Sequence, residues 1–345
     1  MDPIDRAIKH QVTLERLKRG TQASLEKDLA KIEKIFRDIT LALDVPTLDD
    51  LSRTKLNAML AELRRAQQAV MARTVRFLAR ELKGVAEYSV HYEVATLRDG
   101  VENKVKILVP KTEAALAAAY AEPIQATGAL LSVLVDDWPD RQFVAASNMV
   151  RQAWAQGWSP QELAKAVGTT YGEPGALSKR LRREAHAVGH TAIQHVASQA
   201  REHVWASNAD IIRKIMLLAT LDGRTTPLCR SLDHTEYDVD KGPRAPLHIL
   251  CRTTSVALLA PPFDTRSGKR ASMNGLVSAK LSYYDWLKQQ SASFQDEVLG
   301  PTRGKVFRGE GMTAKRFKDL SLDKTFQPLT LKQMKERDPD AFRNV

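Results

Sequence analysis

The chain has 345 residues, 43% of them hydrophobic, which is enough to bury a sizeable core and to form two domains. Its formal net charge of +11 favours contact with an anionic polymer such as nucleic acid, although charge says nothing about fold. Only two cysteines argue against a disulfide-stapled secreted protein, and neither a signal-peptide core nor an apolar stretch of ~20 residues for a membrane span is recognisable. We therefore expect a protein made in a reducing cytoplasm.

Residues 1–110 predict a helical N-terminal arm. Apolar residues recur at spacings of three and four over 4–43, Pro46 interrupts them, and a second run covers about 48–83. Gly84 stands where a helix C-terminal cap is expected. The pattern predicts a helical hairpin whose apolar stripe is core. Because an extended helix must bury its stripe, a docking region that packs on a partner subunit is the alternative.

Residues 111–176 predict a helical module. One helix is expected over 139–156, and a second begins at Ser159, with Ser159 as N-cap and Pro160 at the first helical position. A long helix with a basic beginning is then expected over 177–204.

Two histidines of that long helix share one face. His186 and His190 are one helical turn apart, a spacing at which two side chains can bind the same metal ion. No third ligand is recognisable near them, so the pattern is more typical of surface or buried structural imidazoles.

The stretch 213–262 organises the rest of the chain. Two apolar runs of strand length, 215–220 and 253–259, predict two paired strands. Between them lies a polar loop with both cysteines, two of the eight histidines and a cluster of Asp and Arg. Loops of this length are usually functional or disordered, and this loop is too rich in specific polar side chains to indicate disorder.

The last part, 263–345, predicts a basic C-terminal helical region. It starts with a glycine-containing loop that carries Arg266, Lys269 and Arg270, and a helix over 283–298 is followed by short helical pieces. The expected fold class is mainly α with a small α+β C-terminal domain. In it, a helical N-terminal region precedes a β-hairpin-like element that carries a long structured loop and is flanked by helices. The expected division is 1–110, 111–176, 177–262 and 263–345.

The central loop carries a family resemblance. The segment Asp222-Gly223-Arg224-Thr225, then Cys229, then Pro246 to Arg252 resembles the signature D-x-R-T … C … P-x-H-x-x-C-R of the Mu F-like phage head morphogenesis family. The likeness extends through roughly the C-terminal half of the chain. Two positions differ from the family pattern. Thr226 stands near a position at which family members often carry a further cysteine, and His190 stands where they typically carry an arginine.

The resemblance implies a minor structural protein of a tailed-phage head, which is associated with the portal and the capsid interior and acts in head morphogenesis and in DNA packaging or delivery. The implied partners are the portal protein, capsid or scaffold subunits, and double-stranded DNA contacted nonspecifically through its phosphates. The implied location is the head interior or portal vertex of the virion, and the host cytoplasm during assembly.

Basic side chains in two places are the candidates for that DNA contact. They are Lys179, Arg180, Arg182, Arg183, Arg303, Lys305, Arg308, Lys315 and Arg316.

For the loop we favour a structural clasp that needs neither cofactor nor catalysis. Asp222 pairs with Arg224 or Arg252, Thr225 caps the turn, and the cysteines fill small buried gaps. The expected clasp residues are Asp222, Arg224, Thr225, Pro246, His248, Cys251 and Arg252.

Three other interpretations remain open. A structural zinc site would use Cys229, His248 and Cys251, with Asp222 or His234 as fourth ligand. Catalysis by a cysteine would depend on a histidine base and on the arginines that flank the cysteines.

The third alternative is a metal-dependent nuclease or toxin-like enzyme delivered with the phage genome. Acidic residues of the loop would bind Mg²⁺ in such an enzyme. These residues are Asp222, Asp233, Glu236, Asp238 and Asp240.

Overall fold

The computed structural model describes residues 3–170, 173–263, 268–343 and 345. It is mainly helical with a small sheet in the C-terminal half, which confirms the predicted fold class. None of the helices in these ranges is both long and apolar enough to cross a bilayer.

The chain forms two compact units. Unit 2 comprises Leu14–Glu87 and Leu116–Ala197, and unit 1 combines the N-terminal residues up to Thr13 with Tyr88–Ala115 and Ser198–Val345. The four-part division at residues 110, 176 and 262 stays a prediction.

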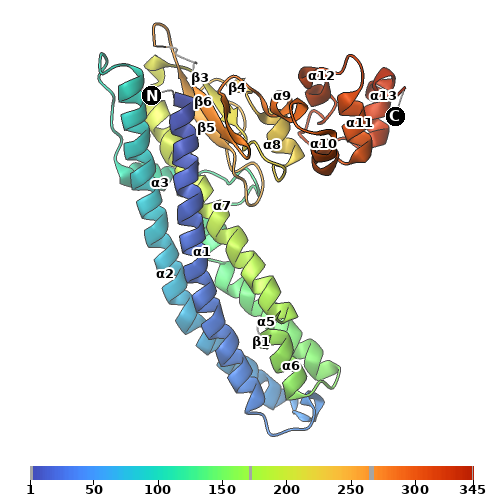
Figure 1. Cartoon of the computed structure of the whole chain (residues 1–345). Helices are drawn as coiled ribbons and strands as arrows, with labels where there is room; N and C mark the ends of the chain where they lie inside the picture. Colours follow the sequence, from blue (N-terminus) through green and yellow to red (C-terminus); the bar gives the residue numbers. More distant parts are fainter. Residues whose placement is uncertain (1–2, 171–172, 264–267, 344) are drawn as a thin grey trace. The chain divides into compact units, whose positions relative to one another are not determined.

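Unit 2 is a bundle of helices. Its main elements are the larger parts of α1 (Pro3–Leu41), α2 (Arg53–Gly100) and α7 (Ala176–Ser207), which lie side by side in this unit (Figure 1). The shorter elements are η1 (Leu48–Asp50), α4 (Leu131–Val135), α5 (Trp138–Ala155), α6 (Pro160–Val167), β1 (Thr169–Thr170) and β2 (Glu173–Pro174). Helix α3 (Thr112–Ala121) has residues in both units.

A continuous apolar stripe explains why α1 is helical and where it packs. Leu25, Leu29, Ile32 and Phe36 are spaced by three or four residues, and each is at most 2% exposed. This spacing places them on one helix face, which is buried inside unit 2.

Polar contacts add specificity to that packing. The carboxylate of Glu33 on α1 accepts hydrogen bonds from Ser178 Oγ at 2.7 Å and from Arg182 Nη2 at 3.0 Å, both on α7. Lys18 Nζ donates to Gln194 Oε1 at 2.6 Å between the same two helices. Because a buried charge without a partner is costly, these contacts select one register of α1 against α7.

The predicted start of α6 is confirmed. Ser159 Oγ accepts from the backbone N of Glu162 at 3.2 Å, and the Glu162 carboxylate accepts from the backbone N of Ser159 at 2.7 Å. This reciprocal pair is a capping box. Trp154 Nε1 donates to the carbonyl of Leu51 at 2.9 Å, so this tryptophan ties α5 to the segment after η1.

Helix α2 corrects one prediction, because it continues through Gly84 to Gly100. Val85, Ala86 and Val90 beyond the glycine are at most 1% exposed, so the buried face does not stop there. Burying these side chains outweighs the ~1 kcal/mol that a glycine costs in a helix interior.

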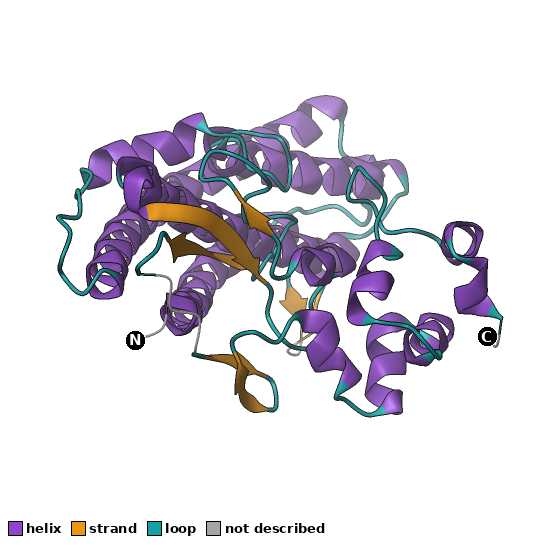
Figure 2. Ribbon diagram, turned by 90° about the horizontal axis from the view of Figure 1, so that it is seen from above, coloured by secondary structure: helices purple, strands orange, loops and turns teal. Residues whose placement is uncertain are grey.

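The sheet of unit 1 has the order β4-β3-β5 with antiparallel neighbours (Figure 2). Its strands are β3 (Ile212–Leu218), β4 (Glu236–Tyr237) and β5 (Thr254–Leu259), and η2 (Ala209–Ile211) leads into β3. The predicted pairing of 215–220 with 253–259 is therefore confirmed. The short strand β4 lies inside the predicted loop and is not foreseen by the sequence pattern.

Strand β3 is buried on both faces. Met216 and Leu218 pack in one cluster with Ile4 and Ala7 of α1. Leu217 and the following Ala219 pack in a second cluster, which contains both cysteines. This alternation is the period of two that a strand imposes on its side chains. The second cluster supplies the floor of the site described below.

The segment after β5 differs from its prediction as a basic loop. Lys269 and Arg270 lie in β6 (Lys269–Ser272), which pairs with β7 (Gly275–Ser278), and Arg270 is fully buried. Arg266 lies outside the described residues.

The C-terminal helices also differ from prediction. The single helix expected over 283–298 is two helices, α9 (Tyr283–Lys288) and α10 (Ala292–Leu299), because Ser291 starts a new helix by accepting from the backbone N of Phe294 at 3.3 Å. Beyond them lie α11 (Pro301–Arg308), α12 (Ala314–Asp319), α13 (Leu331–Arg337) and η3 (Pro339–Phe342). An aromatic core that includes Tyr283, Trp286 and Phe307 joins these short helices.

Candidate metal centre

Residues 219–253, between β3 and β5, form what we call the clasped loop. It contains α8 (Pro227–Leu232) and β4, and its two ends lie close together because β3 and β5 are paired. The two segments of the sequence signature stand at these two ends. The pairing of the strands therefore brings the signature residues into one place.

Asp222 connects the two ends directly. Its carboxylate accepts from Arg252 Nη1 at 2.5 Å and from Arg252 Nη2 at 3.0 Å, a bidentate pair. It also accepts from Thr225 Oγ1 at 3.0 Å and from the backbone N of Arg224 at 3.1 Å. Burial alone would raise the pKa of Asp222, but the Arg252 guanidinium and the other donors outweigh it and lower this pKa.

Of the two arginines considered for Asp222, the structure places the guanidinium of Arg252 against the carboxylate, while Arg224 is exposed and contributes its backbone N. Thr225 lies inside the turn, where its hydroxyl donates to the carbonyl of Thr220 at 2.5 Å. Pro246 is buried at the other end of the loop, ahead of His248.

Cys229, His248 and Cys251 converge in the same loop. Cys229 Sγ lies 3.2 Å from His248 Nε2 and 3.8 Å from Cys251 Sγ, and all three ligand atoms are within 4.8 Å of one another. Both cysteines are at most 2% exposed, and the imidazole is half-buried. In the described ranges this is the one group of three or more His, Cys, Asp or Glu side chains close enough to share a metal ion.

Local structure holds each of the three side chains. Thr226 is the N-cap of α8, whose third residue is Cys229. His248 Nδ1 lies 2.8 Å from the carbonyl of Ile249, which can only accept, so Nδ1 carries the proton and Nε2 faces Cys229 with its lone pair. The backbone N of Cys251 donates to the carbonyl of His248 at 3.2 Å, and Leu250 between them has a φ of 63°.

The two thiols influence each other's ionisation. The hydrogen bond from Cys229 holds the pKa of Cys251 well below its ordinary value, and His248 adds to this effect. That same hydrogen bond, together with burial, raises the pKa of the Cys229 thiol. Burial opposes protonation of His248, but its contact with Cys251 outweighs burial and raises the pKa of His248.

A small cavity of about 30 Å³ opens beside Cys229 and His248. Thr226, Arg224 and Arg252 also line it. Since a water molecule needs roughly 10–15 Å³ of such space, the cavity has room for one or two waters.

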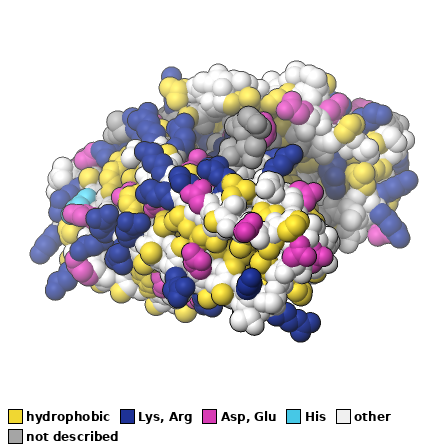
Figure 3. Space-filling model, turned by 90° about the horizontal axis from the view of Figure 1, so that it is seen from below, with side chains coloured by type: hydrophobic (Ala, Val, Ile, Leu, Met, Phe, Trp, Pro, Cys, Tyr) yellow, Lys and Arg dark blue, Asp and Glu magenta, His cyan; other side chains and the backbone are white. Residues whose placement is uncertain are grey.

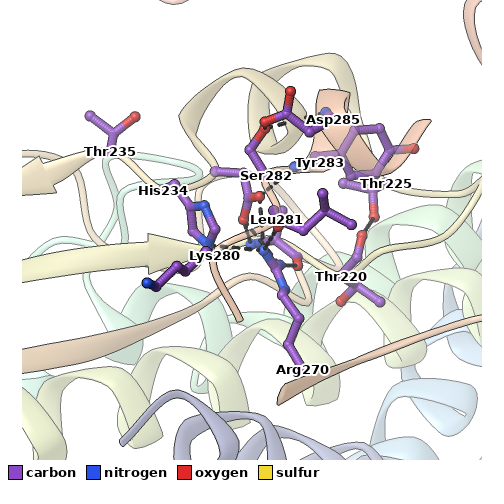
Figure 4. Close-up of polar contacts among 12 residues, drawn as sticks. Thr220, Thr225, His234, Thr235, Arg270, Lys280, Leu281, Ser282, Tyr283 and Asp285 are labelled. Atoms are coloured by element: carbon purple, nitrogen blue, oxygen red, sulfur yellow. Dashed lines mark hydrogen bonds and ion pairs between the residues drawn. The ribbon is translucent and has the colours of Figure 1, made fainter. Parts of the chain in front are cut away.

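Asp222 and His234, the two suggested fourth ligands, are not members of the cysteine–histidine group. Asp222 is engaged by Arg252, as described. His234 Nε2 lies 3.2 Å from Arg270 Nη1 (Figure 4). Burial lowers the pKa of His234, in keeping with a neutral ring that accepts from this guanidinium.

Arg270 is a buried side chain of the loop's surroundings whose contacts the sequence pattern does not reveal. It is fully buried and forms an ion pair with Asp233, Nη1 to Oδ2 at 3.0 Å and Nη2 to Oδ1 at 3.1 Å. Asp233 also accepts from the backbone N of Ala219 and of Tyr283, each at 2.7 Å. Arg270 reaches the turn before α9 through the carbonyl of Leu281 (Figure 4). This pair joins β3, α8, β6 and α9.

The acidic residues proposed for Mg²⁺ do not gather within the described residues. Asp233 is consumed by Arg270, Asp238 forms ion pairs with Lys214 and Lys241, and Glu236 lies 3.8 Å from Arg213. Asp222, Asp233, Glu236 and Asp238 thus each lie beside a cation of their own, and these residues form no group of three within reach of one metal ion among the described residues.

The interpretation as a catalytic cysteine depends in part on Arg230, the arginine next to Cys229, and the structure shows what this side chain contacts. The Arg230 guanidinium points to backbone carbonyls, since Nε donates to Thr225 O at 2.5 Å and Nη1 donates to Val298 O at 3.0 Å. Arg230 therefore fastens the loop to α10.

The basic residues considered for DNA contact fall into two classes. Five are held by neighbours: Arg182 by Glu33, Arg308 by Asp296, Lys315 by Asp319, Arg316 by Asp338, and Arg303 by the carbonyl of Leu329. Lys179, Arg180 and Arg183 of unit 2 and Lys305 of unit 1 are exposed and form none of these contacts. On the face drawn in Figure 3, dark blue cations are interspersed with acidic side chains.

Comparison with known proteins adds no relative. No family model, no curated protein and no solved structure matches this chain with statistical significance. The resemblance to the phage head morphogenesis family therefore rests on the signature residues alone.

Proposed function

We propose that this chain is a minor structural protein of a tailed-phage head, which acts in head morphogenesis and in DNA packaging or delivery. The observation that carries the proposal is the convergence of the signature. Residues 30 positions apart, Asp222 and Arg252, form one bidentate pair, and Arg252 lines the same cavity as Cys229 and His248. A signature whose members meet in this way specifies one loop structure.

The contacts of the loop favour an architectural role over catalysis. Asp222 and Asp233 accept hydrogen bonds from the backbone and from the arginines Arg252 and Arg270, and Arg230 donates to backbone carbonyls. The adjoining cavity is small, about 30 Å³, which is room for water. A loop tied at so many points is a rigid platform for contact with another protein.

In this proposal the portal protein and capsid or scaffold subunits are the protein partners, and DNA is contacted through its phosphates. The four exposed and unengaged cations, Lys179, Arg180, Arg183 and Lys305, are the best placed for phosphate contact. The host cytoplasm during assembly and the head interior or portal vertex of the virion are the corresponding locations.

Particle fractionation tests the proposal. Heads from a lysate of phage-producing cells would be separated by sedimentation, and the chain would be quantified in each fraction by mass spectrometry. We expect it to travel with DNA-filled heads at low copy. Its presence only in soluble fractions or empty precursors would contradict a virion role and would favour the alternative of an assembly factor or an enzyme.

DNA contact has a separate test. Changing Lys179, Arg180 and Arg183 together to Glu should weaken DNA binding and reduce the slope of log K against log salt by about 3, because each phosphate contact contributes nearly one unit. The matched control changes three exposed arginines of α2, Arg73, Arg76 and Arg80, to Glu. Equal losses in both variants would point to net charge alone and would remove this patch from the proposal.

A further inference from the structure

We infer that Cys229, His248 and Cys251 bind one zinc ion, and that a water molecule from the adjoining cavity completes its tetrahedron. The inference depends on the side chains of the clasped loop and holds whether or not the chain is a head protein. Zinc is bound in proteins by cysteine sulfur and histidine nitrogen in a tetrahedral arrangement.

The distances between the ligand atoms fit this ion. With Zn–S bonds of ~2.3 Å, two sulfurs of a tetrahedron lie about 3.8 Å apart. Cys229 Sγ and Cys251 Sγ are 3.8 Å apart. The distance from Cys229 Sγ to His248 Nε2 is 3.2 Å, a few tenths of an ångström below the tetrahedral edge, which a small rotation of the imidazole corrects.

The histidine is already in the form that a metal requires. A ligating imidazole usually donates its other ring N–H to a carboxylate or a backbone carbonyl, which fixes the tautomer and the ring orientation. His248 does so through Nδ1 and the carbonyl of Ile249 at 2.8 Å. Its Nε2 lone pair therefore faces Cys229 Sγ, and all three ligand atoms lie within 4.8 Å of one another.

The backbone around the ligands is organised beforehand. His248 and Cys251 are separated by two residues, and their turn holds Leu250 at a φ of 63°, a conformation that side-chain-bearing residues seldom adopt. Such strain persists where the surroundings impose it and is frequent at ligand sites. Leu217, Leu232 and Leu247 pack around the sulfurs and limit access of water to them.

The chemistry of the ligand set selects the metal. Two thiols and an imidazole suit zinc, whereas magnesium and calcium prefer oxygen ligands. Only three protein ligands are present, and the fourth direction is the cavity bounded by Thr226, Arg224 and Arg252. Its volume of about 30 Å³ admits a water molecule. The ion would thus fasten α8 to the segment before β5.

Metal titration tests the inference. The full chain, purified under reducing conditions and stripped with a chelator, would be titrated with Co²⁺ and then with Zn²⁺. We expect one Co²⁺ per chain, with sulfur-to-cobalt charge-transfer absorption in the near ultraviolet and intense visible bands of a tetrahedral site, and displacement of cobalt by an equimolar amount of zinc. A folded chain that binds neither metal would overturn the inference, as would an intact mass two hydrogens lighter that reveals a Cys229–Cys251 disulfide in the reduced preparation.

Single variants locate the site. Cys229→Ser, Cys251→Ser and His248→Ala should each weaken zinc binding by more than the 10–100-fold that loss of an outer hydrogen-bond partner costs. His91→Ala is the matched control, because His91 is exposed on α2, and it should leave affinity unchanged. Circular dichroism would establish that each variant is folded. Unchanged affinity in a folded His248→Ala chain would overturn the ligand assignment.

A gain of ligand tests the fourth position. Thr226 lines the cavity and stands three residues before Cys229, the spacing of a zinc-binding C-x-x-C pair. Thr226→Cys should replace the water, tighten zinc binding at least ~10-fold and shift the cobalt visible bands towards those of a three-sulfur site. Unchanged affinity and an unchanged spectrum would show that the open position does not face the cavity.

Hydrogen exchange provides a readout apart from affinity. Removing zinc should raise amide exchange in α8 and in the segment 246–254 and leave unit 2 unchanged, because the ion fastens these two segments alone. Equal exchange with and without zinc would contradict a structural ion.

Discussion

Unit 2 and the clasped loop of unit 1 are held together by different kinds of contact. In unit 2, apolar residues at helical spacing carry most of the burial, and a few polar pairs such as Glu33 with Arg182 select the register. In the clasped loop, little backbone is in regular structure, and ion pairs and hydrogen bonds between distant residues specify the shape. From this comparison we expect the effect of a substitution in unit 2 to depend mainly on how much apolar volume it removes. In the clasped loop, we expect the effect to depend on which polar group is replaced.

The largest effect should come from breaking the buried ion pair of the loop. Arg270→Met leaves the Asp233 carboxylate buried without its cation, which should lower the free energy of unfolding by about 3–5 kcal/mol. The free energy of unfolding of wild type and variant would be measured by chemical denaturation. The control is Lys315→Met, which removes an exposed pair and should cost under ~1 kcal/mol. Similar small losses in both variants would refute the special role of the pair.

A somewhat smaller effect is expected from apolar volume in unit 2. Leu25 is fully buried on α1, so Leu25→Ala should destabilise the chain by about 2–4 kcal/mol through lost burial and a residual cavity. Leu41→Ala on the same helix is the control, because Leu41 is 47% exposed and its loss should cost under ~1 kcal/mol. The measurement is again denaturant unfolding, and equal costs for the two leucines would mean that the stripe of α1 is not the core.

The Asp222–Arg252 pair should give a moderate effect that depends on pH. The pKa of Asp222 is lowered in the folded chain, so its ionised form contributes stability above the unfolded value near 3.9, and this contribution is lost as pH falls through the lower folded value. Asp222→Asn should therefore destabilise by about 1–2 kcal/mol at neutral pH. The gap between wild type and variant should narrow in acid, which thermal unfolding across pH 2–7 would measure. A stability difference between wild type and Asp222→Asn that does not change with pH would show that the charge of Asp222 is not the cause.

The smallest effect has the opposite sign. Gly84 lies inside α2, and a Cβ built on it meets no atom within 4 Å. Gly84→Ala should therefore stabilise the chain by about 0.5–1 kcal/mol, because alanine loses less backbone entropy on folding. Gly242→Ala in the loop is the contrast, since Gly242 has a φ of 83° and its Cβ would lie 2.2 Å from Tyr237. A destabilised Gly84→Ala chain would mean that α2 bends at this glycine.

Local patterns in the sequence predict much of this fold. The capping box at Ser159, the helical stripe of α1 and the two paired strands all follow from signals that lie within a few residues of each element. The end of α2 does not, because the helix passes Gly84 in order to bury Val85 and Val90. Its true length depends on partners far along the chain.

The sequence predicts which residues belong to the site but not how they contact one another. The residue types at Cys229, His248 and Cys251 suggest a metal, but the sequence cannot say whether their atoms meet, since this depends on how the residues between Cys229 and Cys251 fold. Arg224 and Arg252 are equally good partners for Asp222 on paper, and only the pairing of β3 with β5 selects the second. Arg270 belongs to a segment that reads as a basic loop, and nothing near it in the sequence points to Asp233.

The composition of unit 1 from three separate stretches affects how the chain is synthesised. Every residue of unit 2 has been synthesised once Ala197 is added, whereas Ile4 and Ala7 await Met216 and Val256, which are made more than two hundred residues after them. The N-terminal turns of α1 therefore remain without their apolar cover through most of translation. A nascent chain stalled before β5 would expose that face to chaperones or to other chains, while its helical bundle could already be complete.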